Sequence, residues 1–462
     1  MTFGLGSSEL RTLERASRWQ SMIDIGREIR RIGSSSLARN AGWMLAGQGS
    51  GFVLQAAYFV LIARLLGAYE YGLFAGAFAL TGILGQYSTM GSGTLFLRYV
   101  SADYRLASVY WGNILAATTV VSLAMMLALS FLSGHLLGAG TGSILLLAAV
   151  ANCFCNQLIS CAARVFQTFE QMRMTAGLSL ATNFARTAAA GGMLVWVNRI
   201  GGRIGGHHAS AYAWSVAMTG VSGVAAVAAV AMVTARVGFP KFDIRQMKGN
   251  LVEGFEFSFA TSTSLAYNDI DKAMLGHYGM NVANGIYSMA YRVIDVATIP
   301  VLAVREAAMP RFFRGGAEGI RGSALLAVSL LKRTLPMAVV SGIGVFAIAP
   351  LVPRLAGHGF AESVSALRWL CLIPLFRSIH HMTGSAMTGS GRQTYRTVSQ
   401  VVAAAFNFGT NLYLIPRFGW LGAAWSSLMT DGMLAMVNSG MLLGMCRLEG
   451  LRAKSEGLTV TV

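Results

Sequence analysis

The sequence predicts an all-α protein that crosses a membrane about twelve times. Of its 462 residues, 54% are hydrophobic and only 12% are charged, whereas about a quarter of the residues in a typical soluble domain are charged. Apolar runs of roughly 17–25 residues, the length that crosses the hydrocarbon core of a bilayer, recur along the chain. The 54 glycines suit close helix packing in lipid, because small residues let helix backbones approach each other.

Hydropathy places the predicted spans in order along the chain, joined by short connections. The longest connection, about 305–334, contains RFFRGGAEGIRG and is predicted to be a polar hinge. We expect a basic N-terminal segment 1–41, a six-helix lobe 42–236, a linker 237–254, a second six-helix lobe 255–446 and a tail 447–462. The expected spans are 42–63, 72–97, 109–132, 143–163, 177–198, 210–235, 255–275, 285–304, 335–353, 364–388, 397–415 and 420–445.

The distribution of basic residues predicts that both termini are cytoplasmic. Most of the 36 Lys and Arg residues fall in the two tails and in alternate loops on one side, which is the cytoplasmic side by the positive-inside rule. The net charge of +17 is therefore mainly a matter of topology, and we expect no nucleic-acid partner. The opposite edges carry only Arg64, Arg199, Arg203, Lys272, Arg354 and Arg417.

The N-terminal segment 1–41 is polar and lacks the short apolar core and cleavage site of a signal peptide. Two interpretations of this segment remain open. Residues 10–32 form either a basic amphipathic helix on the inner leaflet or part of a partly disordered tail.

A weak internal repeat relates the two halves of the chain. YGLFAGAFAL, from Tyr71, matches NGIYSMAYRV, from Asn284, in its glycine, aromatic and alanine positions. AYAWS, from Ala211, matches GAAWS, from Gly422. The separations of about 213 and 211 residues predict parallel repeats related by an axis along the membrane normal.

Several stretches resemble the polysaccharide transporter family of lipid-linked oligosaccharide flippases, in the multidrug/oligosaccharidyl-lipid/polysaccharide exporter superfamily. They are IARLLGAYEYGLFAGAFAL, GSGTLFLRYVS, DIDKAMLGHYGMNVANGIYSMAYRV, AMPRFF and NFGTNLYLIPRFGWLGAAWSS, and the resemblance covers most of 39–446. It implies two six-helix bundles around a cavity that opens alternately to either face. It also implies export of a polyprenyl-diphosphate-linked repeat unit across the bacterial inner membrane, for exopolysaccharide, capsule or O-antigen. Membrane lipids and the polymerase and chain-length machinery are the further partners implied, and no cofactor is expected.

Cationic side chains within the spans are the candidate substrate-binding residues. A diphosphate needs cationic partners along its path, and an Arg inside a membrane helix is costly unless it faces the protein interior. We expect Arg186 and Arg377 to face the cavity, with a structural Arg bonded to helix carbonyls as the alternative. The full set of candidate cavity cations is Arg186, Arg377, Arg292, Arg368 and Arg98.

Acidic residues within the spans are candidates for coupling or gating. SLAYNDIDKAML contains Asp269, Asp271 and Lys272, which we interpret as a polar rim at the outer mouth, with Lys272 able to reach the outer headgroups. A structural cluster and a cation or proton site are the alternatives. Asp295 lies three residues after Arg292 and can pair with it on one helix face.

Further polar groups lie in the last three spans. Asp431 can take up a proton or pair with an Arg of a facing helix. His380 and His381 are interpreted as cavity lining or core, with a proton relay as the alternative.

An enzyme and a multidrug antiporter are the competing interpretations. A membrane polymerase or ligase needs a sizeable outer loop, whereas the outer loops here are short and carry no HExxH motif or paired carboxylates. We therefore expect no catalytic residues. The five cysteines contain no CxxC pair and are predicted to be buried small hydrophobes rather than metal ligands: Cys153, Cys155, Cys161, Cys371 and Cys446.

Overall fold

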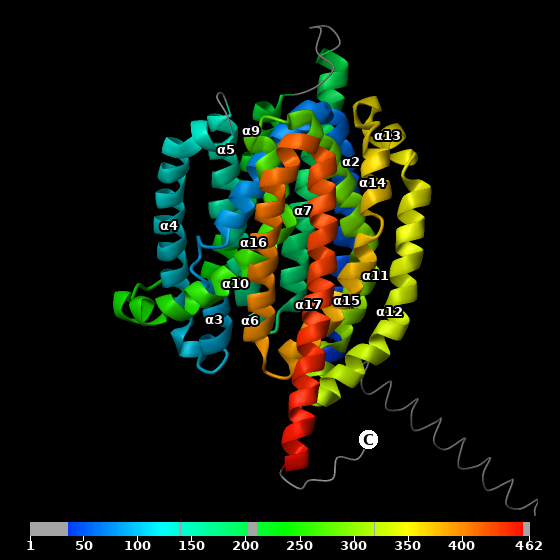
Figure 1. Ribbon diagram of the computed structural model, residues 1–462. Coiled ribbons are helices and arrows are strands. Elements are labelled where there is room, and N and C mark those ends of the chain that lie inside the picture. The colour runs from blue at the N-terminus through cyan, green and yellow to red at the C-terminus, as the bar shows by residue number, and fades with distance from the viewer. Residues whose placement is uncertain (1–35, 138–140, 202–209, 318, 456–462) are drawn as a thin grey trace, which may run out of the picture.

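The computed structural model describes residues 36–137, 141–201, 210–317 and 319–455. These residues form a bundle of long helices that run in roughly the same direction, and no strand occurs among them (Figure 1). Within these described residues, seven helices are long and apolar enough to cross a membrane, or eight if a bent pair, His358–Leu370 and Ile373–Gly389, is counted as one span. The fold is thus the expected all-α membrane fold, while most of the N-terminal segment 1–41 lies outside the described residues.

The helices follow the predicted spans in order. The first half contains α2 (Ser36–Gly85), α3 (Ser92–Val100), η1 (Tyr104–Leu106), α4 (Ala107–Leu136), α5 (Gly142–Ala149), the π-helical turn η2 (Val150–Cys155), α6 (Asn156–Thr168), α7 (Met172–Trp196), η3 (Val197–Gly201) and α9 (Ala211–Val237). The second half contains α10 (Ile244–His277), α11 (Asn281–Ala317), α12 (Ile320–Ile348), α13 (Leu351–Ala356), η4 (His358–Phe360), α14 (Ser363–Leu370), α15 (Ile373–Gly389), α16 (Gln393–Phe418) and α17 (Trp420–Ser455).

Two backbone breaks divide the described residues 36–100. Gly67 has φ 70° and ψ 173° inside α2, so it separates the two predicted spans that α2 contains. A second break, residues 86–91, separates α2 from α3; we call this segment the elbow. Met90 and Gly91 have φ values of 46° and 65° in the elbow, a left-handed conformation that ends a helix.

The α11–α12 connection lies within the predicted 305–334 but is much shorter, because both neighbouring helices continue into this range. α11 runs to Ala317 and α12 begins at Ile320. The carboxylate of Glu449 accepts hydrogen bonds from the backbone N–H groups of Ile320 and Arg321 at 3.3 and 3.2 Å. This contact from α17 satisfies the first N–H groups of α12. Residue composition alone could not reveal it, because Glu449 is distant in the sequence.

The two halves meet at a tight seam between α2 and α11. A Cβ atom on Gly72 would lie 1.8 Å from the carbonyl oxygen of Asn281, and one on Gly285 would lie 2.0 Å from that of Ala68. The two pairs, Gly72 with Gly285 and Ala68 with Asn281, are each 213 residues apart. Each half therefore makes the same contact with the other half, through equivalent positions of the repeat. A two-fold axis relating the two repeats would produce this arrangement.

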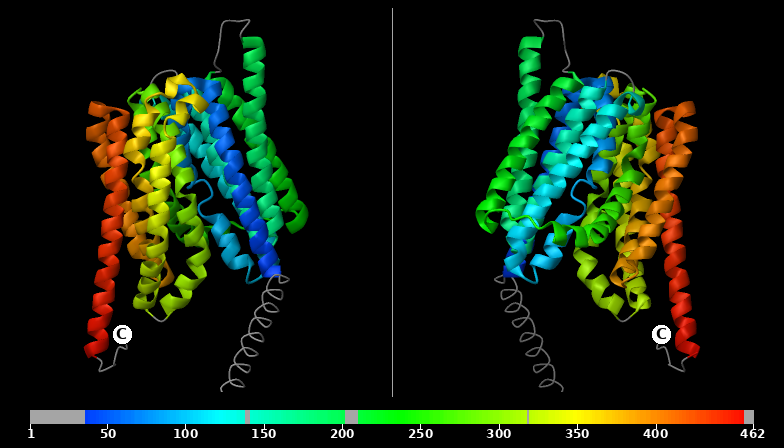
Figure 2. Two further views of the ribbon diagram at one scale, coloured as in Figure 1. Left: turned by 90° about the vertical axis from the view of Figure 1, so that its right-hand side faces the viewer. Right: turned by 90° about the vertical axis from the view of Figure 1, so that its left-hand side faces the viewer.

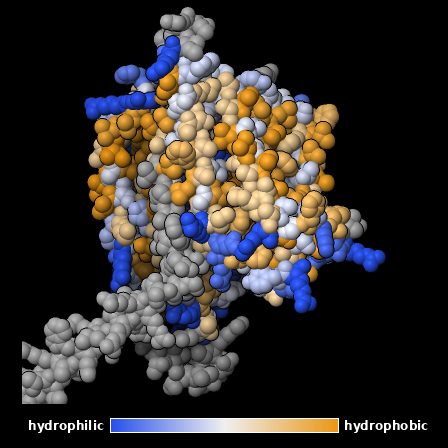
Figure 3. All heavy atoms as spheres, turned by 180° about the vertical axis from the view of Figure 1, so that it is seen from behind, coloured by the Kyte–Doolittle hydropathy of each residue, from blue (hydrophilic) through white to orange (hydrophobic). Residues whose placement is uncertain are grey.

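The seam lies toward the upper end of Figure 1, and the helices diverge toward the lower end, where α3 and the C-terminal end of α17 lie (Figure 2). At the upper end the side chain of Arg64 donates hydrogen bonds to the backbone oxygens of Arg354 and Leu355. On the face seen in Figure 3, apolar residues cover a broad belt, and hydrophilic residues gather at the upper rim and in the lower third. This distribution fits a bundle whose middle is surrounded by lipid.

Candidate functional site

A cavity of about 180 Å³ lies between the two halves of the molecule; we call it the central cavity. Its charged lining residues are Arg186 of α7, Asp269 of α10 and Arg292 of α11. Most of the remaining wall comes from α2, which contributes five aromatic side chains: Tyr58, Phe59, Tyr71, Phe74 and Phe78. Two of the five predicted cavity cations therefore reach one cavity, and they do so from opposite halves.

Arg186 is held at the cavity by polar groups of α6 and α9. Its Nη2 donates to Oδ1 of Asn156 at 2.5 Å and to Oγ of Ser222 at 3.4 Å. Its Nε is buried and has no hydrogen-bond partner. No carboxylate of the described residues forms a salt bridge with this guanidinium, so its charge is available to an anionic ligand.

Arg292 lines the same cavity from the other half and has a similar arrangement. Its guanidinium carbon lies 4.8 Å from the ring centre of Phe59, and its Nη1 donates to Oδ2 of Asp295 at 3.3 Å. The buried Nε again has no hydrogen-bond partner. The expected pairing of Arg292 with Asp295 is present.

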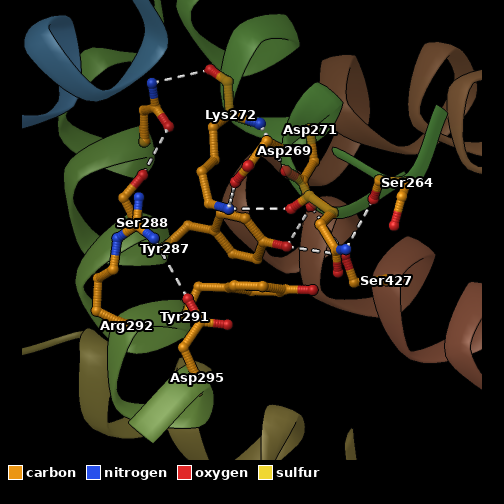
Figure 4. A network of polar contacts seen from close by, with 12 residues as sticks. Ser264, Asp269, Asp271, Lys272, Tyr287, Ser288, Tyr291, Arg292, Asp295 and Ser427 are labelled. Carbon is orange, nitrogen blue, oxygen red and sulfur yellow. Dashed lines mark hydrogen bonds and ion pairs between the residues drawn. The ribbon is translucent and has the colours of Figure 1, made fainter. Parts of the chain in front are cut away.

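Asp269 and Lys272 form an ion pair one helical turn apart on α10, as their spacing predicts (Figure 4). Nζ of Lys272 also donates to the backbone oxygen of Asn268 at 3.0 Å and lies 4.1 Å from the ring centre of Tyr291. Lys272 is only 1% exposed. The expectation that it reaches the outer headgroups is wrong, because the carboxylate, the carbonyl and the ring together hold the ammonium inside the protein.

Asp271 turns away from the central cavity and is fully buried. Its carboxylate accepts hydrogen bonds from the hydroxyls of Tyr287 and Ser427 and, at 2.7 Å, from the backbone N–H of Lys272 (Figure 4). None of the described cations lies within salt-bridge distance of it. Asp271 thus ties α10 to α11 and α17 through neutral donors.

Arg377 is the centre of a buried network in the second half. Its guanidinium donates to Asp295, Asn268 and Tyr291 at 3.1, 3.0 and 2.7 Å, respectively. Its Nε lies 3.6 Å from a carboxylate oxygen of Asp431, whose other oxygen lies 3.1 Å from Nε2 of His380.

Arg377 does not line the central cavity, but it is linked to Arg292 because both contact Asp295. Asp431 lies beside Arg377 of a facing helix, which agrees with the interpretation that it pairs with such an Arg. His381 lies beside His380, with its Nδ1 3.4 Å from Nη1 of Arg305.

The last two candidate cations lie apart from this cluster. Arg98 of α3 is exposed and forms a salt bridge with Glu253 of α10. Arg368 of α14 is exposed, and its guanidinium carbon lies 5.2 Å from the ring centre of Phe346. Neither lines the central cavity.

Sequence reasoning missed several uncharged residues that hold these charged groups in place. Asn156, Asn268, Tyr287, Tyr291 and Ser427 hold the charged groups in place, yet their types carried no signal by themselves. Tyr287 and Tyr291 lie in the repeat segment NGIYSMAYRV, so the repeat was the signal that could have singled them out.

The site has the groups for binding an anion and no set of metal ligands. No cluster of three or more His, Cys, Asp or Glu side chains in the described part of the chain could hold a metal ion. Arg side chains bind phosphate oxygens strongly, and aromatic faces offer apolar contact to ring-shaped groups.

The chain matches one protein family by sequence and several solved structures by fold. A sequence profile of the family described as "Polysaccharide biosynthesis protein" matches residues 37–315. Among curated proteins, none matches the sequence.

Solved transporter structures share the fold at low sequence identity. An inward-facing multidrug resistance MATE family transporter of the MOP superfamily has a TM-score of 0.68 and 13% identity, over 86% of this chain and 96% of that chain. Lipid II flippase MurJ, in an inward closed conformation, has a TM-score of 0.68 and 12% identity, over 86% of each chain. A MOP superfamily transporter from Pyrococcus furiosus has a TM-score of 0.59 and 12% identity, over 89% of this chain and 96% of that chain.

Proposed function

Because the chain belongs to the polysaccharide biosynthesis protein family and has the fold of membrane transporters rather than of an enzyme, we propose that it is a flippase. Its substrate is a polyprenyl-diphosphate-linked oligosaccharide repeat unit, which it moves across the bacterial inner membrane. The unit then serves a polymerase and chain-length machinery that make exopolysaccharide, capsule or O-antigen.

The observation that carries the proposal is the pair of arginines in the central cavity. Arg186 and Arg292 line it from opposite halves, and each has a buried Nε without a partner. A diphosphate placed between them would accept charge-assisted hydrogen bonds from both halves at once. The aromatic wall of α2 would contact the sugar rings, while the prenyl chain stays in the surrounding lipid.

The closed seam and the diverging lower end support alternating access. The reciprocal contact at Gly72 and Gly285 holds the upper ends of the two six-helix lobes together. The helices diverge toward the lower end, where α10 still packs against the elbow and α3. In the proposed orientation the lower end and both termini are cytoplasmic. The substrate headgroup enters there, and separation of the seam releases it on the outer side.

Asp295 gives the cavity a connection to the interior of the second lobe. It contacts Arg292 at the cavity and Arg377 in the buried network. An anion that binds Arg292 competes with Asp295 and so changes the partners of Arg377, Asp431 and His380. In this proposal Asp269, Asp271, Lys272, Asp295 and Asp431 act in coupling or gating rather than in substrate binding.

A multidrug antiporter is the second candidate, because a multidrug transporter shares the fold as closely as the flippase does. The charge of the central cavity favours the flippase. Its lining carries two Arg side chains and one Asp side chain, which would repel a cationic drug.

The test uses a deletion strain complemented with the wild-type protein or with Arg186→Ala, Arg292→Ala or the control Arg368→Ala. Lipid-linked repeat units are extracted from spheroplasts after treatment with an impermeant glycan-modifying reagent. We expect the deletion and both cavity variants to keep unmodified units on the inner side, while Arg368→Ala restores export. Modified but unpolymerised units in the deletion strain would reject the flippase and favour a polymerase.

A further inference from the structure

A second cavity, of about 190 Å³, lies at the elbow between α2 and α3; we call it the elbow cavity. Three elements contribute to its wall, namely the elbow with the start of α3, the helix α6 and the lower part of α10. α6 separates it from the central cavity, because Asn156 bonds to Arg186 whereas the next residue, Gln157, lines the elbow cavity. Most of its lining side chains are polar or small, including Gln86, Thr94, Gln157, Ser160, Arg164 and Ser258.

The first feature of the elbow cavity is the N-terminus of a broken helix. α3 has nine residues, and its N-cap Gly91 is left-handed and supplies no side-chain cap. Gly91, Gly93 and Thr94 from this first turn line the cavity. The N-terminus of a helix carries partial positive charge, and in transporters the ends of broken helices commonly contact anionic groups.

The second feature is the guanidinium of Arg164. Its Cγ lies 3.6 Å from the position that a Cβ on Gly93 would occupy, so the side chain runs along the first turn of α3. No hydrogen bond or salt bridge joins this guanidinium to another described residue. The side chain is exposed, and the wall of the cavity contains no carboxylate among the described residues.

The third feature is a buried hydroxyl without a partner. Ser258 of α10 lines the elbow cavity and is only 3% exposed, and its Oγ has no hydrogen-bond partner. Buried hydroxyls are almost always paired, so this group points to a ligand. It comes from the second half, whereas Arg164 comes from the first half.

Close backbone packing fixes these features relative to each other. A Cβ on Gly91 would lie 2.3 Å from the carbonyl oxygen of Gly254, and one on Gly254 would lie 2.0 Å from that of Met90. With no side chain between the elbow and α10, Ser258 is held one helical turn beyond this contact, facing the same cavity as α3 and Arg164.

We propose that the elbow cavity binds a phosphate group of the prenyl-diphosphate substrate on the cytoplasmic side, before the headgroup reaches Arg186 and Arg292. This inference rests on the proposed function. Arg164 and the first turn of α3 supply the positive charge, and Ser258 donates a hydrogen bond from the opposite half. Phosphate bound there contacts both halves near the lower end.

The test measures binding of farnesyl diphosphate to the purified full-length protein in nanodiscs of zwitterionic lipid. The background carries Arg186→Gln and Arg292→Gln, so that binding in the central cavity is weakened. We expect Arg164→Gln to weaken binding about tenfold or more, because a charge-assisted bond is lost, and Ser258→Ala to weaken it by about a few-fold. The matched control is Arg105→Gln, an exposed Arg on the same side of the molecule that does not line the cavity.

Competition identifies the source of the phosphate. Inorganic diphosphate that displaces farnesyl diphosphate from the background protein, but not from the Arg164→Gln variant, supports a headgroup site. Phosphatidylglycerol in the nanodisc that displaces it equally well shows a phospholipid site and overturns the substrate assignment. Unchanged farnesyl diphosphate binding in Arg164→Gln and in Ser258→Ala, both with wild-type thermal stability, also overturns the inference.

Failure of this inference is distinguishable from failure of the proposed function. If the elbow variants bind normally while the deletion strain still accumulates repeat units on the inner side, only the elbow site is rejected. If the deletion strain accumulates none there, the flippase itself is rejected.

Discussion

At the residue scale, burial decides what each arginine does. Arg368 and Arg377 lie nine positions apart in the sequence, and both were predicted to be cavity cations. Arg377 is 7% exposed and contacts two carboxylates. Arg368 is exposed and contacts an aromatic ring. Positions nine apart lie on opposite sides of an α-helix, so the two side chains point toward different surroundings even before the 48° bend between α14 and α15 is considered.

Replacing Arg377 should therefore destabilise the protein strongly. Arg377→Leu leaves the nearly buried carboxylate of Asp431 without its guanidinium partner, and breaking a buried ion pair costs about 3–5 kcal/mol. Arg368→Leu should change the stability by less than about 0.5 kcal/mol, as surface substitutions usually do. Thermal unfolding in detergent, followed by fluorescence-detected size exclusion, compares the two variants. Equal melting temperatures would contradict the structural role of Arg377.

At the element scale, contact between two repeat-related helices positions the central cavity. α2 supplies the aromatic wall, and α11 supplies Arg292 and the link to Asp295. Because Gly72 and Gly285 have no side chains, the backbones of these two helices can touch at the seam. Asn284 also donates a hydrogen bond to the backbone oxygen of Gly72 at 2.8 Å.

A methyl group at the seam should separate these two helices. Gly72→Ala places a Cβ 1.8 Å from the Asn281 carbonyl oxygen, and overpacking of this kind typically costs about 1–3 kcal/mol. The matched control is Gly82→Ala in the same helix, where no heavy atom lies within 4 Å and alanine improves helix propensity. We expect a lower melting temperature for the Gly72 variant only. A melting temperature at or above that of the Gly82 variant would show that the seam is not closed in the folded protein.

At the scale of the whole molecule, the apolar belt and the two polar ends set the orientation. The rule for basic residues predicts that the lower end is cytoplasmic, and the proposed route of the substrate from the elbow cavity to the central cavity depends on that direction. This orientation is a proposal that labelling can test.

Single cysteines at the two ends should label from opposite sides of the membrane. In a background with the partly exposed Cys371 and Cys446 replaced by alanine, Tyr69→Cys at the upper end should react with an impermeant maleimide on spheroplasts. Tyr69 is 53% exposed. Lys241→Cys, at the exposed start of the second half, should react only after permeabilisation. The reverse pattern would invert the proposed direction of transport.

The sequence alone determined the class of the protein and the order of its helices, because apolar length and charge asymmetry are properties of the chain itself. It also singled out the charged residues worth examining and the pairing of Arg292 with Asp295, since neighbours on one helix face follow from helical spacing. The repeat pointed to Gly72 and Gly285 as equivalent positions.

Only the tertiary structure decided which charges share a cavity, because that depends on contacts between residues far apart in the chain. It placed Arg186 opposite Arg292, buried Lys272 against Asp269 and Tyr291, and left Arg98 and Arg368 outside. The elbow cavity has the same origin. Arg164, Gly91 and Ser258 have no common sequence pattern, and they meet because a left-handed glycine breaks the helix where α10 packs against it.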